Sequence, residues 1–209
     1  MDAADENLIE VRVRFSMSDA RGAFDKLSQE LQPALGELQA GAEVQSISLR
    51  ESSVGVGYSG PGFEMVLDIS RMILDDVGRL AALGGWILWL KERVSRKRNR
   101  MTVISDSPTM GAVAAASVAS SSLIGYRFVL AQPITGWPQH PDETDERFVW
   151  VATFEHDERH EVLVVFMSPA GILLGQVVVP VHSYMDERGL RFRTADELAD
   201  LFRRRNGFA

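Results

Sequence analysis

The sequence predicts an α+β fold, in which an N-terminal lobe of strands and helices precedes a C-terminal antiparallel β-meander closed by a helix. Two observations support this prediction. In the first half, apolar residues recur either at every second position or at every third and fourth position, the periods of strands and helices. In the C-terminal part, short apolar runs are separated by turn signals, as in consecutive antiparallel strands. The composition, 45% hydrophobic and 24% charged over 209 residues, is that of an ordinary globular protein.

The first strand, the first helix and the second strand follow from these periods. Residues 9–15 alternate apolar and charged side chains, as a half-buried strand does. Apolar residues at spacings of three and four then predict a helix over residues 18–38, with Ser18 as its N-cap. Residues 44–50 alternate again and predict a second strand, which a glycine-rich segment follows.

A long helix is expected next, over residues 62–98. Apolar positions spaced by three and four residues run through this segment without interruption. The Gly84–Gly85 pair is expected either to permit close approach of another helix or to bend this one. Residues 101–105 indicate a third strand, so the N-terminal lobe, residues 1–106, has the predicted order β-α-β-α-β. This layout is too general to indicate a family.

The C-terminal lobe, residues 107–209, begins with an Ala- and Ser-rich segment that we predict to be helical, and continues with several short strands. SPAG at 168–171 and DERG at 186–189 supply tight turns, so neighbouring strands are expected to form an antiparallel meander. A capping box from Thr194 to Glu197 then predicts a terminal helix. The boundary between the two lobes is not sharp, and they can share one core.

Composition and charge restrict the classes of function. The chain has no cysteine, which excludes disulfides, thiolate catalysis and cysteine-based metal sites. Its net charge of −7 argues against general nucleic-acid binding. The N-terminal residues MDAADENLIE have no apolar core and are not a secretory signal, so we expect a cytoplasmic protein. The apolar residues 80–90 would rise only ~16 Å as a helix, against ~30 Å of hydrocarbon, so no membrane-spanning helix is expected.

The segment LAALGGWILWLKERVSRKRNR, residues 80–100, gives the most distinctive functional signal. Its first eleven residues are all apolar or small, so a helix there needs cover on every side from a core, a partner or lipid. The ten residues that follow carry +5, which leaves −12 for the rest of the chain. We therefore predict a non-enzymatic scaffold or adaptor that binds a protein partner or assembles as a homo-oligomer.

The predicted partner-binding residues form an apolar group and a basic run. The apolar group makes the contact, and the basic run sets its register by pairing with acids such as DETDE at 142–146 and EHDERHE at 155–161. The apolar residues are Leu83, Trp86, Ile87, Trp89 and Leu90. The basic residues are Lys91, Arg93, Arg96, Lys97, Arg98 and Arg100.

The same segment has other interpretations. The cations can simply be solvated at a helix C-terminus, where they complement the helix dipole. Alternatively, Trp86 and Trp89 beside the basic run are typical of a peripheral helix on an anionic membrane surface. Nucleic acid is disfavoured because no aromatic residue interleaves the basic run.

A small-molecule- or nucleotide-binding enzyme is the second alternative. GVGYSG at 55–60, within the Gly-rich loop 55–62, matches a dinucleotide-binding pattern, although a glycine-rich connector is the favoured interpretation. SDSPTMG at 105–111 follows a strand and precedes a helix, so it can hold a small anion or simply begin that helix with Ser107 as N-cap.

The histidines give no stronger case for an enzyme. His156 and His160 flank a predicted hairpin loop, and we interpret them as solvated turn residues rather than metal ligands. No catalytic residue, cofactor or metal is assigned from the sequence, which favours a protein that is not an enzyme.

Overall fold

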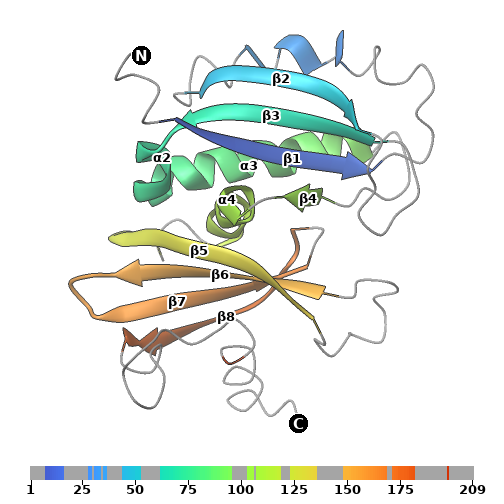
Figure 1. Cartoon of the computed structure of the whole chain (residues 1–209). Coiled ribbons are helices and arrows are strands. Elements are labelled where there is room, and N and C mark those ends of the chain that lie inside the picture. The colour runs from blue at the N-terminus through green and yellow to red at the C-terminus, as the bar shows by residue number, and fades with distance from the viewer. Residues whose placement is uncertain are drawn as a thin grey trace.

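The fold is α+β, as the sequence predicts, and contains two antiparallel sheets of four strands each (Figure 1). The structure is a computed structural model that describes residues 8–16, 28–29, 31–33, 35–36, 44–52, 62–95, 103–105, 107–118, 123–135, 148–168, 171–181 and 197. The predicted terminal helix lies outside these residues except for Glu197, which is helical.

The first sheet has the strand order β2-β3-β1-β4. Its strands are β1 (Leu8–Ser16), β2 (Val44–Ser52), β3 (Gly62–Ser70) and β4 (Val103–Ser105). Helical residues between positions 28 and 36 join β1 to β2, and a second helical connection joins β3 to β4, which is the split β-α-β pattern. The predicted strand over 9–15 is confirmed, because Val11 and Val13 are fully buried while Glu10 and Arg12 are exposed.

The prediction of one long helix over residues 62–98 is wrong in its first quarter. Residues 62–70 form the strand β3, between β1 and β2, so the lobe has the order β-α-β-β-α-β. Met65, Leu67 and Ile69 are fully buried at a period of two, which is the strand pattern. Val66 is buried as well, and its spacing to later apolar residues imitates a helix, which explains the error.

Two helices follow β3, and Asp76 separates them. They are α2 (Met72–Asp75) and α3 (Val77–Ser95). The backbone of Asp76 is extended, with φ −103° and ψ 99°. Its Oδ1 accepts hydrogen bonds from the backbone N–H groups of Gly78 at 2.9 Å and Arg79 at 3.1 Å, so Asp76 acts as the N-cap of α3. The predicted helix is therefore divided at a capping residue.

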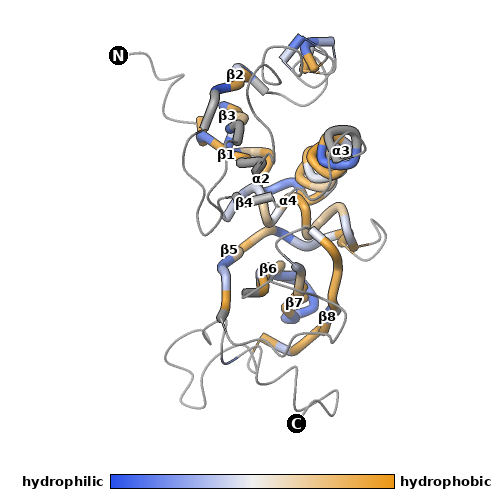
Figure 2. The backbone as a smooth tube through the Cα atoms, turned by 90° about the vertical axis from the view of Figure 1, so that its right-hand side faces the viewer, coloured by the Kyte–Doolittle hydropathy of each residue, from blue (hydrophilic) through white to orange (hydrophobic). Residues whose placement is uncertain are grey.

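Helix α4 (Ser107–Ser117) lies between the first sheet with α3 on one side and the second sheet on the other (Figures 1 and 2). The predicted Ala-rich helix is thus confirmed, and seven consecutive residues, 109–115, are buried. At the crossing with α3, a Cβ on Gly84 would overlap the carbonyl oxygen of Ala112. Gly84 therefore permits close approach of the two helices, one of the two roles expected for the glycine pair.

The second sheet is the predicted antiparallel meander, with the strand order β5-β6-β7-β8. Its strands are β5 (Tyr126–Thr135), β6 (Phe148–His156), β7 (Glu161–Met167) and β8 (Leu173–Pro180). Both faces are buried: Phe154, Leu163 and Val165 contribute to the main core, whereas Val162 and Val164 belong to a second cluster on the other face. The main core also contains residues of the first sheet, α3 and α4, so it crosses the predicted boundary near residue 106.

The adjacent glycines of α3 should respond oppositely to substitution by alanine. Gly84→Ala places a methyl group against the backbone of Ala112, so we expect a loss of about 2 kcal/mol or more in the free energy of unfolding. A Cβ on Gly85 meets nothing within 4 Å, so Gly85→Ala should instead gain up to ~1 kcal/mol from helix propensity. Urea unfolding of both variants measures the difference, and equal effects would contradict the close crossing.

The N-cap of α3 can be tested at Asp76. Asp76→Ala removes the acceptor of two backbone hydrogen bonds, and we expect the free energy of unfolding to fall by about 1 kcal/mol. Asp76→Asn keeps a side-chain oxygen and is the matched control, with a smaller loss. The Asp76–Arg79 ion pair is exposed, so its loss in the Asn variant should cost little stability. If Asp76→Asn lowers the free energy of unfolding as much as Asp76→Ala does, the charge of Asp76 rather than its capping hydrogen bonds stabilises the helix.

Candidate interaction surface on helix α3

Helix α3 has one face in the core of the protein. Of the predicted contact residues, Leu83, Ile87 and Leu90 lie on this face, with exposed fractions of 1%, 0% and 0%. They are covered by the protein itself and cannot touch a partner in this conformation. The surface left for a partner is narrower than the sequence indicates and centres on Trp86 and Trp89.

The opposite side of α3 is exposed and carries no charge between residues 80 and 90. We call Ala82, Gly85, Trp86 and Trp89 the outer face of α3. Trp89 is 40% exposed, Trp86 is half-buried against the core, and their ring centroids lie 6.4 Å apart. Figure 2 shows α3 at the flank of the molecule, with the first sheet on one side of it and α4 below. An uncharged strip with two tryptophans therefore lies on the outside of the fold.

Exposed apolar residues also occur at the start of β8. Gly171 has a φ of +77°, and a Cβ there would approach Leu88 of α3 to 3.0 Å, so Gly171 lies against the helix. The next two residues, Ile172 and Leu173, are 55% and 39% exposed. Leu88 lies beside Gly171 and is not part of the outer face.

The basic run follows directly from the outer face. Lys91 is half-buried, and Arg93 lies in the last turns of α3. Arg96, Lys97, Arg98 and Arg100 lie outside the described residues, so their role in setting the register of a contact stays a prediction.

Two acidic segments are expected to pair with the basic run, and the structure describes one of them. Residues 142–146 lie outside the described part of the chain. In the hairpin at 155–161, Glu155 and Asp157 accept hydrogen bonds from Arg127, at 2.6 and 3.4 Å. Glu161 lies 3.5 Å from Arg159 and accepts a hydrogen bond from Tyr126. Because these acids already have partners within the chain, they are less suited to docking than the sequence suggests.

Two further exposed acids, Asp75 and Asp76, lie just before α3. Asp75 is the last residue of α2, whereas Asp76 caps α3 and pairs with Arg79 at 3.2 Å. The basic run begins at the C-terminal end of α3. An acidic junction thus precedes α3, and the uncharged face with tryptophans lies in the middle of the helix.

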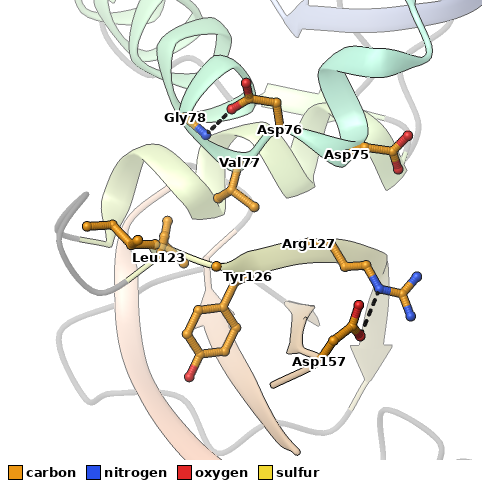
Figure 3. A pocket seen from close by; sticks show the side chains of 10 residues that line it. Asp75, Asp76, Val77, Gly78, Leu123, Tyr126, Arg127 and Asp157 are labelled. Carbon is orange, nitrogen blue, oxygen red and sulfur yellow. Dashed lines mark hydrogen bonds and ion pairs between the residues drawn. The ribbon is translucent and has the colours of Figure 1, made fainter. Parts of the chain in front are cut away.

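A groove of about 550 Å³ lies beside these acids, between the α2–α3 junction, the start of β5 and the β6–β7 hairpin (Figure 3). Its charged side chains are those of Asp75, Asp76, Arg127 and Asp157. Asp76 caps α3, and Arg127 pairs with Asp157, so three of the four have structural roles. No sequence pattern indicates this groove, because its walls come from three separate segments.

His156 corrects our interpretation of the two histidines. His160 is exposed in the turn, as expected, but His156 is only 5% exposed. Its ring packs edge-on against Tyr126 with centroids 5.0 Å apart, and a Cβ on Gly125 would lie 2.6 Å from its Nε2. Within the described residues, no cluster of three or more histidines and acids that could hold a metal is present.

The structure describes one residue of the Gly-rich loop and most of the serine-containing motif. The Gly-rich loop 55–62 lies outside the described residues except for Gly62, the first residue of β3. In the motif at 105–111, the hydroxyl of Ser107 accepts a hydrogen bond from the backbone N–H of Ala131 at 2.9 Å. Ser107 therefore ties the start of α4 to β5, a structural role that the sequence did not indicate.

Comparison with known proteins adds no assignment: no protein family, curated protein or solved structure matches the chain. Among the described residues, no helix has the length and apolar character needed to cross a membrane.

Tyr126 and Glu161 form a hydrogen-bonded pair that sequence analysis missed. Tyr126, His156 and Glu161 lie in register across β5, β6 and β7, and the tyrosine hydroxyl donates a 2.6 Å hydrogen bond to Glu161. Burial and this hydrogen bond raise the pKa of Tyr126 to about 12. The same hydrogen bond lowers the pKa of Glu161. No spacing in the sequence indicates this row, because it depends on the register of three strands.

The raised pKa of Tyr126 should make stability fall at alkaline pH. Below the unfolded pKa of 10, the stability that the buried, protonated Tyr126 contributes to the folded state is fully present. This contribution to the free energy of unfolding should be lost as the pH rises from about 10 to about 12. Tyr126→Phe removes this dependence, so the stability difference between wild type and variant should shrink across that range. Urea unfolding at several alkaline pH values measures it, and parallel pH profiles would contradict the pairing.

Proposed function

We propose that the protein is a non-enzymatic interaction protein, a scaffold or adaptor, that assembles with itself or with a protein partner through the outer face of α3. The observation that carries the proposal is the 40% exposure of Trp89, beside Trp86, on a helix face without charge. Tryptophan is enriched among the residues that dominate binding energy at interfaces.

The energetic argument supports a contact at this place. A tryptophan side chain presents ~250 Å² of surface, so covering the exposed part of Trp89 is worth on the order of 2 kcal/mol. Leu88, the next residue before Trp89, is half-buried and adds partly exposed apolar surface. Lys91 follows on the same helix and supplies a charge at the border of this surface, which favours specificity and orientation.

An anionic membrane surface is the second candidate, since tryptophans next to cations also suit a headgroup layer. Trp86 is partly packed into the core, which leaves less apolar surface for insertion than an all-exposed helix would offer. Binding to vesicles of anionic lipid, absent with neutral lipid and lost at high salt, would favour this candidate over the first.

The proposal is tested by the double substitution Trp86→Ala, Trp89→Ala. We expect the molar mass of the wild type, measured by light scattering after gel filtration, to exceed that of a monomer and to fall in the double variant. A mass that persists at high salt indicates an apolar contact, whereas dissociation at high salt indicates that the basic run dominates.

Val178→Ala is the matched control, because it removes a 45% exposed apolar side chain from β8 instead of α3. It should leave the mass unchanged. Proteins retained from a lysate by the wild type provide a second readout. The proposal is overturned if the double variant assembles and retains the same proteins as the wild type.

A further inference from the structure

We infer that the partner of the outer face is a second copy of this chain, whose α3 runs antiparallel with a two-fold axis between Gly85 and Trp86. The inference rests on the proposed function and names the partner of the same surface. It combines three observations: the order of large and small residues along the outer face, the opposite charges of Arg79 and Glu92 toward the two ends of α3, and the open space over Gly85.

The outer face is complementary to itself in shape. In an antiparallel pair with this axis, residues equally distant from the axis face each other. Trp89 then lies opposite Ala82 of the second copy, and Trp86 lies opposite Gly85 of the second copy. Each large ring therefore meets a small residue. Because a Cβ on Gly85 would have nothing within 4 Å, the space needed for an opposing ring is present in the free protein.

The charges along α3 agree with the same orientation. The axis places Glu92 opposite Arg79 of the second copy, and both residues are exposed. Arg79 also pairs with Asp76 of its own chain, at 3.2 Å. The two helix dipoles also oppose each other, so the N-terminal end of each helix lies beside the C-terminal end of its neighbour.

A parallel pair would reverse these advantages. It would bring Glu92 of one copy beside Glu92 of the other, and Arg79 beside Arg79. It would also place Trp89 against Trp89 and leave Ala82 facing Ala82, so that bulky positions coincide and small positions leave gaps. The antiparallel arrangement is the one in which shape and charge are satisfied together.

Single cysteines test the geometry, since the natural chain contains none. In the antiparallel pair, position 85 faces the axis, so Gly85→Cys should form a disulfide-linked dimer on mild oxidation. Position 82 and its copy are ~10 Å apart along the helices, and position 78 and its copy ~22 Å, too far for a disulfide. Ala82→Cys and Gly78→Cys should therefore remain uncrosslinked. Efficient crosslinking at 78, 82 and 85 alike would show a parallel pair and overturn the inference.

Gly85→Leu provides a second variant that keeps the fold. Its side chain projects into open space in the monomer but occupies the place of Trp86 of the second copy. We expect an unchanged or higher thermal midpoint together with at least a tenfold weaker dimer, measured by sedimentation over a range of protein concentrations. Arg79→Glu and Glu92→Arg should each weaken the dimer, and the double variant should restore it.

The outcomes separate this inference from the proposed function. If the double tryptophan variant dissociates but Gly85→Cys does not crosslink, the outer face is a contact surface and the antiparallel geometry is wrong. A wild type that stays monomeric at the highest concentration rules out a second copy, while loss of retained proteins in the tryptophan variant still supports the proposed function. If neither assembly nor retention depends on the tryptophans, both are overturned.

Discussion

The close crossing of α3 and α4 at Gly84 is the contact on which the rest of the structure depends. It brings the backbone of Ala112 against α3 and allows α4 to occupy the narrow layer between the two sheets. The apolar face of α3 covers the first sheet, while α4 carries the same core onward to the second sheet. A side chain at Gly84 would separate the two helices and therefore the two halves of the core.

The sequence predicts those elements whose burial pattern has a single period. β1 alternates cleanly because one of its faces is buried, and the short apolar runs of the C-terminal part correspond to the strands of the meander. β3 was misassigned because Val66 is buried between Met65 and Leu67, which obscures the alternation. Whether Gly84 would kink α3 or admit another helix depends on α4, which lies far along the chain, so local sequence alone cannot decide it.

For the candidate site, the sequence indicates the apolar segment but not which of its residues are exposed. An all-apolar stretch with two tryptophans indicates that cover is needed on every side, but not which residues the protein covers itself. The first sheet and α4 cover Leu83, Ile87 and Leu90, leaving Trp89 outside. The pairing of Arg127 with Glu155 and of Tyr126 with Glu161 depends on strand register, which explains why these acids looked available in the sequence.

The position of α4 in the middle of the molecule also affects how the chain is synthesised. When α3 has left the ribosome, the first three strands and their helices are complete, but the side of α3 that receives Ala112 has no neighbour yet. Its apolar surface stays uncovered until α4 and the meander have followed. Exposed apolar surface on an emerging chain favours premature association, so this layer order makes the interval before α4 emerges the vulnerable stage of synthesis.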